Sequence, residues 1–156
     1  DNFIYIAGAD SDHGLEIDGP EGAENATGSF TLKNGWMKGL TSEYADFRDG
    51  ARGTIENIYF FNFPGNADIE LDDDASSANY FSGALVIKGN EINTSHLTEG
   101  NRTIEDIVAD KAAAGNEAAF DAQMAMDNNI VNSATIGADA SAFSWTYAMN
   151  KGVITN

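Results

Sequence analysis

The residues with the clearest chemical potential are acidic side chains that recur in three similar segments. The segments are Leu-Glu-Ile-Asp-Gly at 15–19, Ala-Asp-Phe-Arg-Asp-Gly at 45–50 and Ile-Glu-Leu-Asp-Asp at 69–73. If these segments are stacked strands, one row contains Glu16, Asp46 and Glu70, and the next contains Asp18, Arg48 and Asp72. Neighbouring side chains in a row would then lie roughly 5 Å apart, which is the strand spacing.

Carboxylates at this separation suit a catalytic pair. Their repulsion raises a carboxylate pKa, and retaining glycosidases use two carboxylates about 5 Å apart. Asp18, Asp46, Arg48 and Asp72 are therefore the candidate catalytic residues of a polysaccharide lyase or hydrolase. The alternative, which we favour, is a solvated ladder of charges in which Arg48 relieves the repulsion between Asp18 and Asp72.

Three consecutive aspartates, Asp72, Asp73 and Asp74, form the best candidate metal site. Oxygen-rich loops suit Ca²⁺, which is the one cofactor that the sequence suggests. EF-hand spacing is absent, so a solvated acidic loop from Asp72 to Asn79 is the favoured alternative. His13 could act as an acid or base beside neighbouring carboxylates, although a structural role is favoured.

Trp36 and Tyr59 form a candidate ligand-binding surface. In the same stacking scheme they point outward from neighbouring strands, one above the other. Two aligned, exposed aromatic side chains suit contact with a glycan or a protein partner. The alternative is that a loop covers both rings.

Composition restricts the classes of function. The chain has 156 residues and a formal charge of −17, from 25 acidic and 8 basic residues. Such a surface repels phosphate backbones, so no nucleic-acid partner is expected. The absence of cysteine excludes disulfides and thiolate chemistry. No apolar run reaches the roughly 18 residues of a membrane helix, so the chain is not expected to span a membrane.

The fold is indicated by a second set of strand-like segments that follows the first. These segments are 30–37, 54–60 and 85–92. Glu16 precedes Asp46 by 30 residues, and Asn34 precedes Asn57 by 23, which is the period of a solenoid. No helical pattern lies between the strands, so the sequence predicts an all-β parallel β-helix, with a β-sandwich as the alternative. Asn34 and Asn57 would align in a short ladder of side-chain amides.

The predicted interior consists of apolar residues that alternate with polar ones along each strand. They are Leu15, Ile17, Phe47, Ile69 and Leu71 in one sheet, and Leu32, Met37, Ile55, Phe60, Ile87 and Ile92 in the other. The solenoid coils are expected to occupy residues 1–95. Residues 96–156 are expected to form a helical or irregular C-terminal cap on the last coil. A capping box at Thr103 predicts one helix, and Asn116 is expected to cap a second at 117–126.

Three blocks carry a resemblance to a known family. They are Asp-His-Gly-Leu-Glu-Ile-Asp-Gly-Pro-Glu-Gly at 12–22, Tyr-Ala-Asp-Phe-Arg-Asp-Gly-Ala-Arg-Gly-Thr at 44–54 and Ala-Asp-Ala-Ser-Ala-Phe-Ser-Trp-Thr at 138–146. Together they resemble the C-terminal part of an uncharacterised family of Bacteroidota cell-surface proteins. Its members are described as right-handed parallel β-helices, are often lipoproteins and are sometimes misannotated as multidrug transporters.

The resemblance implies a right-handed parallel β-helix at the cell surface, either at the outer membrane or outside the cell. Family members carry more coils before the first block, so this chain is expected to be part of a longer chain or complex. The family supplies no catalytic residues. We therefore expect a non-enzymatic scaffold or adhesin-like module that binds a glycan or an outer-membrane partner. The alternatives are a polysaccharide lyase or hydrolase, and an accessory subunit of a larger outer-membrane assembly.

Overall fold

The computed structural model describes residues 1–7, 14–20, 26–38, 44–61, 69–93, 103, 108–110, 116–144, 146 and 150–152. The first strands are β1 (Phe3–Ile6), β2 (Leu15–Asp18), β3 (Phe30–Lys38), β4 (Ala45–Arg48), β5 (Gly53–Phe61) and β6 (Ile69–Leu71). After them come α1 (Asp74–Ser82), β7 (Leu85–Lys88), β8 (Glu91–Ile92), β9 (Val108–Asp110), α2 (Glu117–Asp127), β10 (Asn129–Ile130) and a 3₁₀ turn at Ala140–Phe143.

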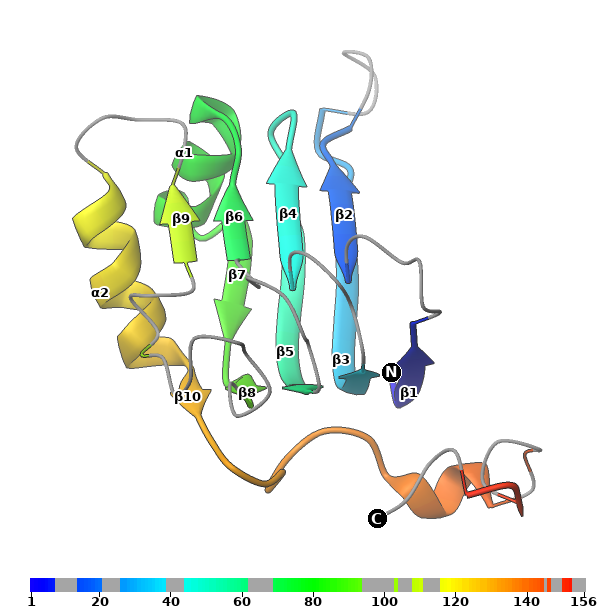
Figure 1. The fold of residues 1–156 in the computed structure, drawn as a ribbon. Coiled ribbons are helices and arrows are strands. Elements are labelled where there is room, and N and C mark those ends of the chain that lie inside the picture. The colour runs from blue at the N-terminus through cyan, green and yellow to red at the C-terminus, as the bar shows by residue number, and fades with distance from the viewer. Residues whose placement is uncertain are drawn as a thin grey trace.

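Two parallel sheets make up the body of the molecule (Figure 1). One sheet has the order β2-β4-β6-β9, and the other has the order β1-β3-β5-β8-β10, with β7 also paired to β5. The first six strands alternate between the two sheets along the chain. Each strand therefore pairs with strands from the next and the previous passage of the chain, and every pairing among the described strands is parallel.

The register of the strands confirms the predicted alignment of the acidic segments. Glu16 is opposite Asp46, and Asp46 is opposite Glu70. The long strands β3 and β5 pair over most of their length, which places Trp36 opposite Tyr59. Because parallel strands keep equivalent positions in line, residues that occupy the same position in successive segments become neighbours on one face.

The apolar residues predicted for the interior form one core. Phe47, Leu71 and Ile92 have no exposed surface, and Met37, Ile55, Phe60, Ile69 and Ile87 are at most 2% exposed. Leu15, Ile17 and Leu32 are partly buried and pack against this core. The alternation of apolar and polar residues along each strand therefore predicted correctly which face points inward.

Asparagine side chains connect the strands at the bends. Asn57 Nδ2 donates to Asn34 Oδ1 at 2.5 Å, as the predicted amide ladder requires. Both residues have positive φ values, 59° and 56°, which asparagine tolerates better than most residues. Asn90 is fully buried; its Oδ1 accepts from Ile58 N at 3.0 Å, and its Nδ2 donates to Asn128 Oδ1 at 2.9 Å. These amides satisfy backbone groups that the bends remove from the sheet.

The predicted fold class is wrong. The described residues form a mixed α/β arrangement of two parallel sheets and two α-helices, and not an all-β right-handed parallel β-helix solenoid. The clearest departure is α1, which begins inside the stretch expected to be an acidic loop. Its ends are well defined, because Asp73 caps the first turn and Gly83, at φ 80°, ends the last.

The C-terminal part also differs from expectation. The helix predicted after Thr103 is wrong where the chain is described, because Val108–Asp110 form β9 beside β6. The second predicted helix is confirmed as α2, which packs beside β9 and β7. β9 and β10 both lie beyond residue 95 and extend the two sheets. The division into residues 1–95 and 96–156 stays a prediction.

The chain after β10 runs below the strands toward β1 (Figure 1). Asp139 N donates to Asn2 Oδ1 at 2.7 Å, so this segment contacts the residue that precedes β1. In the part of the chain that the structure describes, no helix is both long and apolar enough to cross a membrane.

Asn90 offers a direct test of the buried amide bonds. We expect Asn90→Leu to lower the free energy of unfolding by about 3 kcal/mol, because Ile58 N and Asn128 would lose a buried partner. Urea unfolding followed by circular dichroism measures the loss. Asn129→Ala is the matched control, because that side chain is exposed, and its effect should stay within about 0.5 kcal/mol. Similar losses in both variants would contradict this role.

Candidate functional site

Three aromatic side chains converge where β3 and β5 end. Tyr59 and Phe61 stack with ring centroids 4.8 Å apart and an interplanar angle of 12°. Trp36 meets Phe61 edge to face at 6.4 Å. The pairing of β3 with β5 sets this arrangement, because Trp36 lies opposite Tyr59 and residues two apart on a strand share a face.

The chain after β10 forms a second wall opposite these rings. The two walls enclose a cleft of about 670 Å³. Its lining consists of Trp36, Tyr59, Phe61, Asn132, Ser133, Ala134, Ala138, Asp139, Ala140 and Ser141. We call this the aromatic cleft. A volume of this size lies within the usual range for a small-molecule site, about 300–1,000 Å³.

Buried polar contacts hold the second wall in place. Glu91, 5% exposed, accepts from Thr135 N at 2.7 Å and also from the Thr135 hydroxyl. Asn93 Nδ2 contacts both Tyr59 Oη at 3.0 Å and Asn132 O at 3.1 Å, which links the two walls. The wall is therefore positioned by side chains that belong to β8 or directly follow it.

Gly137 allows the wall to approach the Trp36 ring. A Cβ atom at this position would lie 2.4 Å from Trp36 Cδ1 and 2.8 Å from Gly35 O, and the φ angle of Gly137 is 108°. Only glycine fits both the space and the backbone conformation. Trp36 Nε1 in turn approaches Ile136 O at 3.4 Å.

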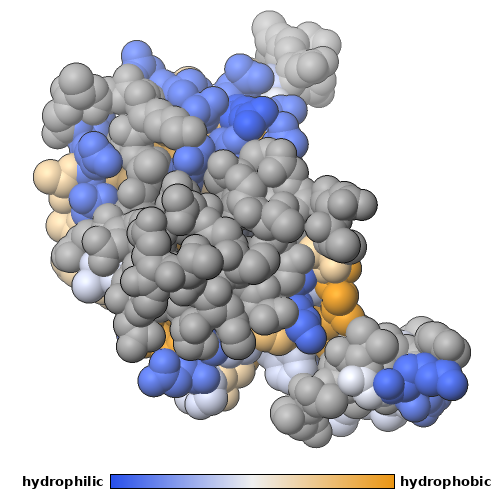
Figure 2. Space-filling view, in the orientation of Figure 1, coloured by the Kyte–Doolittle hydropathy of each residue, from blue (hydrophilic) through white to orange (hydrophobic). Residues whose placement is uncertain are grey.

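The two aromatic residues singled out from the sequence differ in exposure. Tyr59, which also lines the cleft, is only 7% exposed, whereas Trp36 and Phe61 are half-buried. Phe61 is therefore a cleft residue that the sequence did not reveal. Lys38 Nζ lies 5.9 Å from the centre of its ring. Figure 2 shows hydrophobic surface on the β1 side of the body, next to the lobe that the C-terminal segment forms.

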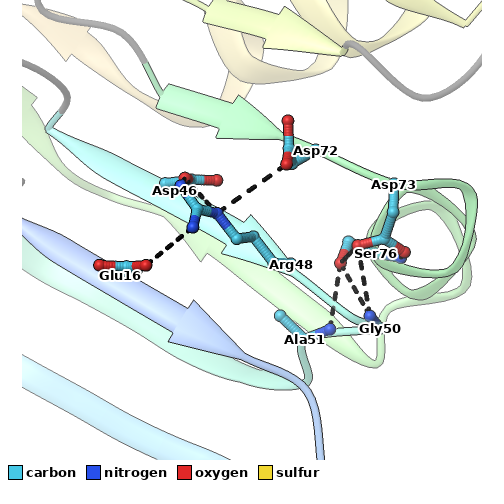
Figure 3. Close-up of polar contacts among 8 residues, drawn as sticks. All are labelled: Glu16, Asp46, Arg48, Gly50, Ala51, Asp72, Asp73 and Ser76. Atoms are coloured by element: carbon cyan, nitrogen blue, oxygen red, sulfur yellow. Dashed lines mark hydrogen bonds and ion pairs between the residues drawn. The ribbon is translucent and has the colours of Figure 1, made fainter.

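The acidic rows lie elsewhere, on the sheet formed by β2, β4, β6 and β9, and they are bridged by Arg48 (Figure 3). Arg48 Nε donates to Asp46 Oδ2 at 2.6 Å, and Nη1 donates to Glu16 Oε1 at 2.8 Å. Nε lies 3.8 Å from Asp72 Oδ2. The hydrogen bond that Arg48 donates to Asp46 is the main reason that the pKa of Arg48 is raised above its usual value, so the guanidinium stays charged. The carboxylates of Glu16, Asp46 and Asp72 are thus paired with one guanidinium across neighbouring parts of the sheet.

Three carboxylates of these rows come close enough to hold a cation. One oxygen each of Asp46, Glu70 and Asp72 lies within 4.8 Å of the others. However, Arg48 already supplies a positive charge to Asp46 and Asp72. Asp18, the remaining catalytic candidate, lines a separate cavity of about 400 Å³ with Glu16 and Arg52. Asp46, Arg48 and Asp72 are not among the residues that line this cavity or the aromatic cleft.

The three consecutive aspartates have different environments. Asp73 caps α1: its Oδ1 accepts from Ala75 N at 2.8 Å and from Ser76 N at 2.9 Å, and its Oδ2 accepts from the Ser76 hydroxyl at 2.8 Å. Burial alone would raise the pKa of Asp73, but these bonds outweigh it and lower the pKa below its usual value. Asp74 is exposed in the first turn of α1. The proposed calcium loop at Asp72, Asp73 and Asp74 stays a prediction, and the Asp73 carboxylate has a structural role.

Comparisons with known proteins add no identification. No protein-family model matches the chain, and neither the curated proteins nor the solved structures give a significant match. The resemblance to the Bacteroidota surface family therefore stays a prediction. His13 and His96 lie outside the described residues.

Arg48 should matter to stability because it is the cation that pairs with a buried carboxylate. Asp46 is 1% exposed, and we expect Arg48→Met to lower the free energy of unfolding at pH 7 by about 2 kcal/mol. The loss is smaller than for a fully buried pair because 36% of the Arg48 side chain is exposed. Urea unfolding at pH 7 measures the loss.

Lys33→Met is the matched control for this pair. Lys33 Nζ lies 2.7 Å from Glu56 Oε2, and both side chains are at least one-third exposed, so its loss should stay below about 1 kcal/mol. The double variant Asp46→Asn with Arg48→Met should lose less than Arg48→Met alone, because no buried charge is left unpaired. A double variant that loses as much as the two single changes combined would contradict this coupling.

Asp73 should stabilise the fold as a helix cap. We expect Asp73→Ala to cost about 1–2 kcal/mol, whereas Asp74→Ala should cost a few tenths, because only Asp73 accepts bonds from the first turn. The folded-state pKa of Asp73 is lowered, so its contribution is present above the unfolded pKa of about 4 and is lost as pH falls through the folded value. Urea unfolding between about pH 6 and pH 2 measures both effects. A Ca²⁺-dependent stabilisation that both variants abolish would instead support the calcium site.

Proposed function

We propose that this protein is a non-enzymatic binding module that holds a glycan in the aromatic cleft. From the sequence resemblance we also propose a location at the cell surface, at the outer membrane or outside the cell. The observation that carries the proposal is the convergence of Trp36, Tyr59 and Phe61 on one cleft with a polar wall opposite them.

Aromatic rings suit sugars because of how charge is distributed in each. The face of an aromatic ring is negative, and it attracts the weakly positive C–H groups on the flat face of a sugar ring. The half-buried Trp36 ring can offer such contact without reorganisation, because its packing against Phe61 already fixes it. Phe61 supports it from a ring that stacks on Tyr59 and lies under Lys38. Rigid aromatic side chains contribute contact area at a low cost in conformational entropy.

The opposite wall supplies hydrogen-bonding groups for the hydroxyls at the edge of a sugar ring. Asn132, Ser133 and Ser141 carry amide and hydroxyl groups that both donate and accept hydrogen bonds. A sugar hydroxyl also does both, so the two sets of groups match. An apolar wall combined with a few polar groups is the usual composition of a ligand site.

The acidic rows favour a structural role over catalysis. Asp46 and Asp72 are both paired with Arg48, and neither lines the aromatic cleft or the cavity beside Asp18. A lyase or hydrolase that uses Asp18, Asp46, Arg48 and Asp72 is therefore the weaker candidate. An outer-membrane protein partner in place of the glycan remains the alternative occupant of the cleft.

The proposal is tested with a panel of oligosaccharides and three variants. Ligand-observed NMR with the wild-type chain should detect binding, and Trp36→Ala and Phe61→Ala should each weaken it at least about tenfold, because truncating a central aromatic contact typically costs more than 1 kcal/mol. Phe81→Ala is the control, since Phe81 is 45% exposed and lies beside a different cavity.

Circular dichroism and urea unfolding show whether each variant is folded. If no oligosaccharide binds, or if the losses in Trp36→Ala and Phe81→Ala are equal, the glycan proposal fails. Release of a product from any polysaccharide that depended on Asp46 would favour the enzymatic alternative.

A further inference from the structure

We propose that the aromatic cleft selects neutral glycans and rejects those that carry uronate or sulfate groups. This inference rests on the proposed function and names the class of ligand. It follows from the charges around the cleft, which are independent of the aromatic contacts that favour a sugar in the first place.

The lining of the cleft lacks a positive charge among the described residues. No lysine, arginine or histidine belongs to it, and its single ionisable carboxylate is Asp139. Sites for carboxylate and sulfate groups commonly use arginine or lysine, because a hydrogen bond from a cation to an anion is about twice as strong as a neutral one. Lys38, the nearby cation, lies over the Phe61 ring and is not part of the lining.

Asp139 holds its negative charge at the cleft. Its Oδ1 accepts from the Ser141 hydroxyl at 2.6 Å and from Ser141 N at 3.0 Å. These two bonds lower the pKa of Asp139 below its usual value, so the carboxylate stays ionised at neutral and mildly acidic pH. They also fix its position, which places a permanent negative charge next to any bound sugar.

The charge of the whole chain acts in the same direction. A formal charge of −17 produces a negative potential that lowers the local concentration of anionic ligands. The effect is strongest at low ionic strength and is screened beyond about 8 Å at physiological salt. A neutral sugar carries no net charge, so this potential does not lower its local concentration, and its hydroxyl groups can donate to the Asp139 carboxylate. Its contacts with the rings are insensitive to salt.

The test compares ligands that differ only in charge. Neutral gluco- and galacto-oligosaccharides are paired with glucuronate and galacturonate oligomers of the same length and linkage, and binding is measured by calorimetry and NMR. We expect the neutral ligand to bind at least about tenfold more tightly than its uronate counterpart at about 20 mM salt. The preference should shrink at about 500 mM salt, while the affinity for the neutral ligand stays constant.

Asp139→Asn and Asp74→Asn form a matched pair of variants. Each removes one negative charge, and asparagine at 139 can still accept the bonds from Ser141. Asp139→Asn should reduce the preference for the neutral ligand at least about threefold, whereas Asp74→Asn, on α1, should leave it unchanged.

The outcomes separate this inference from the function on which it rests. If uronate and neutral ligands bind equally, or the uronate binds better, and Trp36→Ala still abolishes binding, the glycan site stands and the selection for neutral sugars is wrong. Equal effects of the two aspartate variants would likewise overturn the local role of Asp139. If neither class binds, the glycan proposal itself fails.

Discussion

The structure depends on the in-register parallel pairing of β3 with β5. This one register aligns Asn34 with Asn57, so that their amides meet at the bend, and it aligns Trp36 with Tyr59 at the end of the strands. A shift by one residue would move every side chain of a strand to the other face. The bend, the core and the cleft would then be lost together, because all three use positions on the same two strands.

Buried polar groups fix the placement of β8 beside β5. Asn90 is fully buried and Glu91 is 5% exposed, and both are neighbours in the short segment at β8. Asn90 faces the bend and bonds to Ile58 N, whereas Glu91 bonds to Thr135 on the second wall of the cleft. Because a buried polar group without its partner is costly, only one placement of β8 satisfies both residues. The same segment therefore fixes the core and the cleft.

Local pattern was sufficient to predict which strands become neighbours and which side chains face inward. Repetition of Glu16, Asp46 and Glu70 in equivalent contexts gave the register, because parallel stacking aligns equivalent positions. The fold class failed for a local reason. The sequence offers Asp73 as one of three calcium ligands, but an aspartate is also a preferred N-cap residue, and in the structure Asp73 caps α1. The alignment of Trp36 with Tyr59 is confirmed, but the sequence predicted an exposed surface and not a cleft, because the second wall comes from residues about 100 positions away from Trp36.

The acidic rows and the aromatic cleft therefore differ in whether their side chains already have partners within the protein. On the sheet formed by β2, β4, β6 and β9, Arg48 is shared by the carboxylates of Glu16 in β2, Asp46 in β4 and Asp72, which directly follows β6. In the aromatic cleft, by contrast, Trp36 and Phe61 remain half-buried although a wall from a distant part of the chain reaches them. A wall that served only to bury the rings would close over them. This wall instead contacts Trp36 at Ile136 and Gly137 and still leaves a cleft lined by amide and hydroxyl groups, which is the arrangement that a polar ligand with one apolar face requires.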